Sequence, residues 1–181
     1  NVIPDERGKS ARFLGILQDE KAMRKLFQRF VYEFLRREQR VFGVSASIFR
    51  WEQNGTQYRE NQTGRVGLPR MHTDVVLRGQ ERVIVIDTKF TPRPFSTYRG
   101  KTTLRPEHLY QLFAYMANAR RVEQPGTRVE GILLYPSTDA DGFDLRWRIH
   151  EMDVRATSVN LAAPWSRLSA ALMELLVPLP A

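Results

Sequence analysis

The stretch TDVVLRGQERVIVIDTKF (residues 73–90) predicts two antiparallel strands joined by a tight turn. Its VIVI run at residues 83–86 is apolar on both faces, as expected of a central strand that is covered on both sides. Side chains alternate along a strand, so Asp87 and Lys89 share one face. With an even-length loop, the register places Asp74 on that face too, opposite Asp87 or one pair away. We therefore expect two carboxylates and a lysine at one end of a buried strand.

Two carboxylates that are buried side by side suggest a divalent cation, because the burial of two like charges is otherwise costly. Hard oxygen ligands suit Mg²⁺ or Mn²⁺, and such an ion polarises a phosphate and lowers the pKa of a bound water. Lys89 is then a candidate to position that water or to stabilise charge in the transition state. The simpler alternative is a structural salt bridge between Asp87 and Lys89.

Hydrophobic periodicity outside this stretch predicts an α/β fold with one mixed sheet flanked by helices. Helices are expected at residues 19–37, 106–120 and 165–176, strands at 41–51, 72–78, 82–90, 128–135 and 143–154, and turns or loops at 53–56, 57–70, 91–105 and 136–142. Residues 1–18 show no firm pattern and are interpreted as an arm or linker, which leaves residues 19–181 as a single domain.

The helix expected at residues 106–120 supplies a second group of candidate residues. Pro106 suits its first turn, and an apolar stripe should pack on the sheet (Leu109, Leu112, Phe113 and Met116). Gln111 and Tyr115 are four residues apart and therefore lie on one face beside that stripe. They can reach the sheet end that carries Asp87 and Lys89. The alternative is a helix with an ordinary polar edge.

Composition favours a polyanionic partner and excludes several kinds of site. The 181 residues carry a formal net charge of +8, which suggests nucleic acid. There is no cysteine, so disulfides and thiolate zinc sites are excluded, and a reducing compartment such as the cytoplasm is expected. The sequence has no apolar run of membrane-spanning length, so no membrane association is expected. Because the first residue is Asn1 rather than Met, we also expect a fragment of a longer protein.

The segment expected as a loop at residues 91–105 is basic. It contains Arg93, Arg99, Lys101 and Arg105, and no acidic residue occurs between Lys89 and Glu107. Since the segment begins just past the predicted site, we expect these four cations to contact the DNA phosphate backbone without reading sequence. The alternative is a solvated, flexible loop.

Four segments together resemble the McrC family, the cleavage subunits of the McrBC methylation-dependent restriction systems. They are MRKLFQRFV (23–31), the stretch at residues 73–90, LYQLFAYM (109–116) and GILLYP (131–136). The Asp–x12–Asp–x–Lys spacing is similar to that of the PD-(D/E)xK nuclease superfamily. The resemblance implies a restriction-endonuclease-like fold, Asp74 and Asp87 as metal ligands, and Lys89 as the catalytic lysine. It also implies that Gln111 and Tyr115 support the site, like the Gln/Tyr helix motif of RecB-like members.

The chain departs from the family at one acidic position. Gln28 stands where the family usually has a Glu, so Glu20 and Glu33 become the candidates for a third acidic contact, unless only one metal binds well. The family pairs this domain with an AAA+ GTPase, McrB. The chain contains no GxxxxGK[ST] phosphate loop, so GTP hydrolysis is expected to come from that partner. Two alternatives stay open: a stand-alone RecB-like exonuclease or repair nuclease, and a non-catalytic DNA-binding scaffold.

Overall fold

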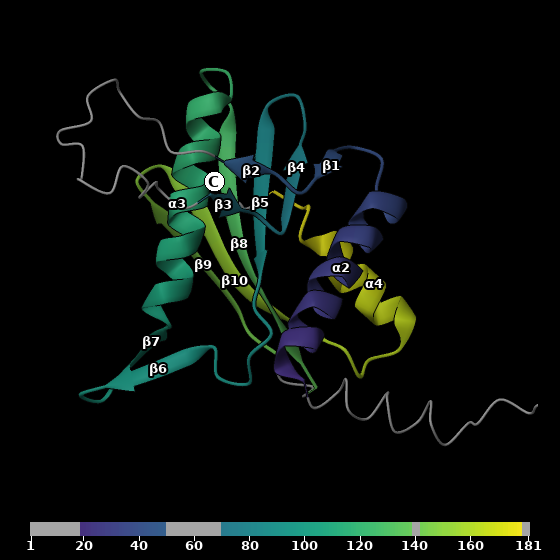
Figure 1. Ribbon diagram of the computed structural model, residues 1–181, viewed down its shortest axis with the longest axis vertical. Helices are drawn as coiled ribbons and strands as arrows, with labels where there is room; N and C mark the ends of the chain where they lie inside the picture. The colour runs from purple at the N-terminus through teal and green to yellow at the C-terminus, as the bar shows by residue number, and fades with distance from the viewer. Residues whose placement is uncertain (1–18, 50–69, 139–141, 179–181) are drawn as a thin grey trace, which may run out of the picture.

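A six-stranded mixed sheet forms the centre of the fold (Figure 1). The computed structural model describes residues 19–49, 70–138 and 142–178. In sheet order the strands are β1 (Gly43–Ser45), β4 (Val75–Arg78), β5 (Arg82–Thr88), β8 (Arg128–Ser137), β10 (Met152–Asn160) and β9 (Asp144–Ile149). Strands β5, β8 and β10 run parallel to one another, and the other neighbours in the sheet pair antiparallel. The expected mixed sheet is confirmed.

Helices cover both faces of this sheet (Figure 1). Helix α3 (Pro106–Val122) packs on one face, and helices α2 (Glu20–Glu38) and α4 (Trp165–Glu174) pack on the other. Strand β5 divides its side chains between them: Val83 and Val85 face α3, whereas Ile84 and Ile86 face α2 and α4. All four are fully buried. The prediction of a central strand covered on both sides is therefore confirmed.

Local sequence explains how these helices begin and pack. The Asp19 carboxylate caps α2 by accepting hydrogen bonds from the backbone N–H groups of Lys21 and Ala22. Pro106 opens α3 at its first turn, where the missing N–H costs nothing. Helix α3 can approach β8 closely because residue 131 is glycine, and a Cβ there would overlap the side chain of Met116. This close packing holds α3 against the sheet.

Four expected segments differ from the structure, and one of them is the strand expected at residues 72–78, which is divided between β3 (Met71–His72) and β4. Residues 91–105 are not a loop, because β6 (Phe95–Tyr98) and β7 (Lys101–Leu104) form a hairpin within them. Residues 143–154 are not one strand: the chain reverses at His150 and Glu151, so β9 pairs with the β10 strand that follows it. Both residues have positive φ, which a type I′ hairpin turn requires, and neither is the Asn or Gly that usually signals such a turn.

The strand expected at residues 41–51 is also divided. It forms β1 in the main sheet and β2 (Ile48–Phe49), which pairs with β3 (Met71–His72) in a separate two-stranded sheet. The expected arm at residues 1–18 and the turn and irregular segment expected at 53–70 lie outside the described residues, except for residue 70. In the described part of the chain, no helix is long and apolar enough to cross a lipid bilayer.

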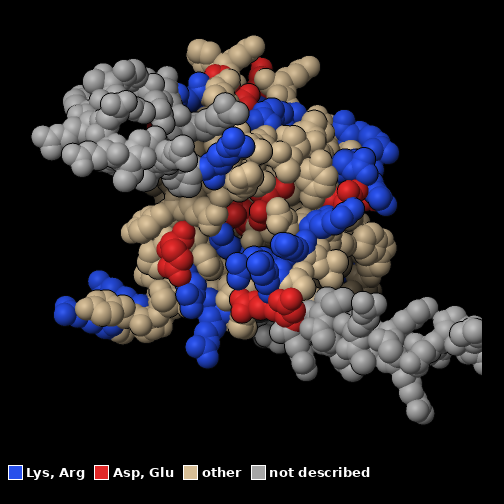
Figure 2. Space-filling view, viewed as in Figure 1, with Lys and Arg blue, Asp and Glu red and all other residues tan. Residues whose placement is uncertain are grey.

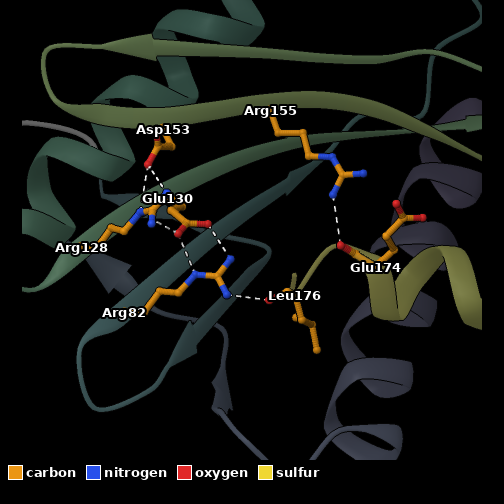
Figure 3. Close-up of polar contacts among 7 residues, drawn as sticks. All are labelled: Arg82, Arg128, Glu130, Asp153, Arg155, Glu174 and Leu176. Carbon is orange, nitrogen blue, oxygen red and sulfur yellow. Dashed lines mark hydrogen bonds and ion pairs between the residues drawn. The ribbon is translucent and has the colours of Figure 1, made fainter. Parts of the chain in front are cut away.

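A buried ionic network joins the amino-terminal ends of β5, β8 and β10 (Figure 3). Arg82 donates two hydrogen bonds to Glu130, both at 2.6 Å, and a third to the carbonyl oxygen of Leu176 just beyond α4. Arg128 bridges Glu130 and Asp153. Since Glu130 is only 3% exposed, its charge depends on these arginines. The network ties the end of α4 to the sheet.

We expect Arg82→Ala to lower the free energy of unfolding by about 3 kcal/mol, because removal of one partner strands a buried charge. Arg128 still contacts Glu130 in that variant, which keeps the loss at the lower end of the usual range. Urea denaturation measures the change. Arg37→Ala is the matched control, since Arg37 lies in an exposed pair with Glu33, and it should barely move the midpoint. Equal effects of the two substitutions would contradict a structural role for the network.

Candidate active site

Asp87 and Lys89 lie at the carboxyl end of β5, on the face covered by α3. Asp87 follows the alternation of Val83 and Val85 and is only 3% exposed. Lys89 Nζ lies 2.7 Å from Asp87 Oδ2. The buried Oδ2 therefore meets one positively charged group, the Lys89 ammonium, and no other donor among the described residues. A carboxylate oxygen with a single contact keeps a lone pair for a further ligand.

Asp74 lies beside Asp87, as the register predicts. Val75 pairs with Ile86, so the next position along the two strands places Asp74 opposite Asp87. Its Oδ2 accepts hydrogen bonds from the backbone N–H of Thr88 at 2.7 Å and from the Thr88 hydroxyl at 2.6 Å. These two bonds fix the Asp74 carboxylate at the end of β5, a role for Thr88 that the sequence pattern did not indicate.

Burial disfavours the ionisation of both carboxylates. Burial raises the pKa of Asp87 to about 6; the Lys89 ammonium opposes that shift, and the charge of Asp74 adds to it. Burial likewise raises the pKa of Asp74, against the hydrogen bonds from Thr88 and the charge of Lys89. Both pKa values are raised, so the hydrogen bonds and the Lys89 charge do not fully offset the cost of burying these two negative charges.

Lys89 is held by a relay of side chains from α3. Its Nζ donates to Gln111 Oε1 at 2.6 Å, and Gln111 Nε2 donates to the Tyr115 hydroxyl at 2.6 Å. Burial raises the pKa of Tyr115, so its hydroxyl stays protonated. The structure thus brings together all five residues that the sequence singled out on strands and helix (Asp74, Asp87, Lys89, Gln111 and Tyr115).

A pocket of about 240 Å³ opens beside this relay, and its lining includes Arg24 and His108, which were not among the predicted site residues. Arg24 reaches it from α2, and His108 from α3, three residues before Gln111. The pKa of His108 is lowered to about 4 by burial, with the cations Lys89, Arg105 and Arg24 adding to the effect. His108 is therefore neutral at pH 7, and its Nδ1 lies 3.0 Å from the Tyr135 hydroxyl. The helical spacing of His108 and Gln111 was the available signal.

Neither candidate for a third acidic contact reaches the site. Glu20 pairs with Arg24, and Glu33 pairs with Arg36 and Arg37 at the far end of α2. Among residues 19–49, 70–138 and 142–178, no group of three or more His, Asp or Glu side chains is placed to hold a metal ion. The site as described therefore offers two carboxylates.

These two carboxylates fit one hard divalent cation. Magnesium commonly binds one or two carboxylates and keeps several waters, so it needs no third acidic side chain. The buried Asp87 Oδ2, which contacts only Lys89 among the described residues, supplies a ligand atom, and the direction of both pKa shifts fits a site that added positive charge would stabilise. Asp74 and Asp87 are accordingly the residues that would hold such an ion.

The four predicted DNA-contacting cations fall into two pairs. Arg99 and Lys101 lie at the turn of the β6–β7 hairpin, whereas Arg93 and Arg105 lie at its base. Arg105 Nε donates to the Arg93 carbonyl at 2.9 Å, and Arg105 also pairs with Glu107. Figure 2 shows Lys and Arg side chains on the projecting hairpin and over the lower end of α2, on the same view of the molecule. The hairpin therefore presents its cations as a projecting ridge.

Fold and site together define a mixed α/β domain with a buried pair of carboxylates and one lysine at the end of its central parallel strand. The chain belongs to the family of McrBC 5-methylcytosine restriction system components, whose model matches residues 4–136. It is also 29% identical over 175 residues to the type IV methyl-directed restriction enzyme EcoKMcrBC of Escherichia coli (strain K12). That alignment covers 97% of this chain and 48% of the relative, so the chain spans about half the length of that protein.

The shifted pKa of Asp87 predicts how stability depends on pH without metal. Because the pKa rises from 3.8 to about 6 on folding, the stabilisation by the bound proton is complete below pH 4 and is lost as the pH rises through 6. Relative to Asp87→Asn, the wild-type chain should lose about 2 kcal/mol of unfolding free energy between pH 4 and pH 7.

Denaturant unfolding in EDTA across this range measures the difference. Glu151→Gln is the control, since Glu151 lies at an exposed turn with its side chain 81% exposed; its difference from wild type should stay flat. A flat profile for Asp87→Asn would contradict the burial argument.

Proposed function

We propose that this domain is a metal-dependent DNA endonuclease of the PD-(D/E)xK class and the cleavage component of a McrBC-type restriction system. The observation that carries the proposal is the convergence of Asp74, Asp87 and Lys89 at one strand end, with Lys89 held by Gln111. Family membership supports a role in restriction. The proposed cofactor is Mg²⁺ or Mn²⁺, and the proposed partners are DNA and an AAA+ GTPase of the McrB type.

When bound, a divalent cation supplies Lewis acidity: it polarises a phosphate oxygen and lowers the pKa of a coordinated water. The side chains of this chain account for the remaining chemistry. Asp74 and Asp87 fix where positive charge is held. Lys89 donates from Nζ to the reacting phosphate group or its attacking water, and thereby stabilises the negative charge that develops there. Gln111 orients Nζ, and Tyr115 in turn orients the Gln111 amide.

Arg24 and neutral His108 line the same pocket and are placed to contact the DNA backbone next to the reacting phosphate. An arginine there supplies charge-assisted hydrogen bonds to phosphate oxygens. His108 can donate one hydrogen bond without adding a charge. Both residues are proposed to bind and position DNA, while the proton transfers belong to the site at Lys89.

The non-catalytic scaffold is the second candidate, because Gln28 replaces an acidic residue and neither Glu20 nor Glu33 reaches the site. Closed-circular DNA separates the alternatives. An endonuclease cuts it when GTP and a McrB-type partner are supplied. A RecB-like exonuclease degrades only DNA with free ends and needs no partner. A scaffold binds DNA with neither activity.

Asp87→Asn should abolish both cleavage and the rise in melting temperature on addition of Mn²⁺, because it removes a ligand charge. Lys89→Met should lower the cleavage rate about a hundredfold or more while the Mn²⁺-induced rise persists, because it removes only the transition-state contact. Glu151→Gln, far from the site on the β9–β10 turn, should change neither property. If Asp87→Asn destabilised the metal-free protein at pH 7 and cleavage survived, Asp87–Lys89 would be a structural salt bridge instead.

Simultaneous substitution of Arg93, Arg99, Lys101 and Arg105 by alanine should weaken DNA binding about equally across sequences. Each lost phosphate contact flattens the plot of log affinity against log salt, by about 0.9 in slope, so four contacts account for a change of about 3.6. Fluorescence anisotropy over a range of NaCl concentrations measures both quantities. The control is the Arg36→Ala/Arg37→Ala pair, at the opposite end of α2 from Arg24. An unchanged slope in the quadruple variant would show that these residues are not the backbone contact.

A further inference from the structure

The β6–β7 hairpin projects from the domain below α3 (Figure 1). Its side chains from Thr97 to Thr103 are all exposed on both strands. The turn is formed by Arg99 and Gly100, both with positive φ, which is the geometry that keeps a two-residue hairpin tightly twisted. A hydrogen bond of 3.1 Å joins the hydroxyls of Thr97 and Thr102 across the strands. The hairpin is therefore an ordered ribbon with no described residue packed against its outer half.

The base of this ribbon is fixed to the domain. The Phe95 ring packs on Phe143 with centroids 4.9 Å apart, and Leu104 packs against the core under α3. The backbone N–H of Arg105 donates to the carbonyl of Pro94, which closes the two strands at their base. A rigid base means that the position of the tip is set by the fold.

The chemistry of the exposed half fits nucleic acid. It carries hydroxyls and cations and no acidic side chain (Thr97, Tyr98, Arg99, Lys101, Thr102 and Thr103). Tyr98 is 72% exposed, and the Arg99 guanidinium stacks on its ring with 5.2 Å to the centroid. Tyr98 thus offers a partner both an aromatic face and a hydroxyl at the tip of the hairpin. Hydroxyls and guanidinium groups are also the donors that contact base edges and phosphates.

We propose that this hairpin enters the major groove of the DNA, with Tyr98 in contact with base edges and with Arg99 and Lys101 on the phosphate backbone. The inference rests on the proposed DNA-cleaving function and goes beyond backbone binding. Four residues per strand extend about 13 Å, which exceeds the major-groove depth of about 8.5 Å. The two backbones lie about 4.8 Å apart, and side chains widen the ribbon further. A ribbon of this width fits the major groove, about 12 Å wide, but not the minor groove, about 6 Å wide.

The place of the hairpin in the fold connects the groove contact to cleavage. Only five residues separate Lys89 from Phe95, where β6 begins, and α3 with Gln111 follows directly after β7. A phosphate at Lys89 and a groove at the hairpin can therefore belong to the same duplex. The hairpin then sets how the DNA lies over the site, and Tyr98 selects among sequences or base modifications in the groove.

Site-directed cross-linking tests the proposal, and the chain is suited to it because it contains no cysteine. Tyr98→Cys and Thr102→Cys each place one thiol on the hairpin, and Val122→Cys, at the other end of α3 and 65% exposed, is the matched control. Each variant of the 181-residue chain is mixed with duplexes that carry an activated disulfide tether either in the major groove, on adenine N6, or in the minor groove, on guanine N2. We expect at least about tenfold more cross-link from the major-groove tether for both hairpin variants and none for Val122→Cys.

A second measurement uses Tyr98→Ala, which should lower DNA affinity about tenfold with an unchanged salt slope, because tyrosine neutralises no phosphate. Equal or absent cross-linking from the two tethers, or cross-linking to a McrB-type partner instead of DNA, would overturn the groove contact. Cleavage by the same variants, assayed with Mg²⁺, GTP and a McrB-type partner supplied, separates the two proposals. Metal-dependent cleavage without a hairpin cross-link removes only the groove contact, whereas a major-groove cross-link without cleavage removes only the nuclease.

Discussion

Strand β5 is covered by helices on both faces, and this burial raises the free energy of every charge placed on it. The rest of the site follows from that constraint. Asp87 has a raised pKa because it lies on this strand, Lys89 lies against it, and α3 supplies Gln111 to hold the lysine. Asp74 tolerates its place beside Asp87 because Thr88 donates to it twice. On a strand open to water on one face, water would solvate the two carboxylates. Their pKa values would then not be raised by burial, and a cation would gain less by binding there.

The two ends of β5 resolve the same constraint differently. At the amino end, Arg82 donates to both oxygens of Glu130 and to a carbonyl beyond α4. Arg128 and Asp153 complete that network, so its charges are matched by protein groups, as a structural ion cluster requires. At the carboxyl end, Asp74 and Asp87 share one cation, Lys89, and the buried Oδ2 of Asp87 contacts only that ammonium among the described residues. Incomplete compensation is what distinguishes a site that can take a ligand from one that only holds the fold together.

Elements with a strong local signal could be predicted from the sequence. The strand period of two could place Asp87 and Lys89 on one face of β5. The helical spacing of four could place Gln111 and Tyr115 on one face of α3, beside its apolar stripe. The β6–β7 and β9–β10 hairpins could not be predicted in this way. Their turns, at Arg99–Gly100 and His150–Glu151, place side-chain-bearing residues at positive φ, and pairing between strands stabilises a backbone geometry that these residues do not favour alone.

The sequence by itself indicated the shared face of Asp74, Asp87 and Lys89, because strand alternation has a fixed period of two. It left Asp74 opposite Asp87 or one pair away, and the pairing of Val75 with Ile86 decided between these registers. Tertiary structure decided which distant side chains meet that face. Arg24 and His108 reach the pocket, whereas Glu20 and Glu33 are directed into ion pairs with arginines of their own helix. The periodicity of one helix or strand determines only the face of that element on which a side chain lies. What it meets there depends on how α2 and α3 pack on the sheet, and that packing is set by contacts between residues far apart in the chain.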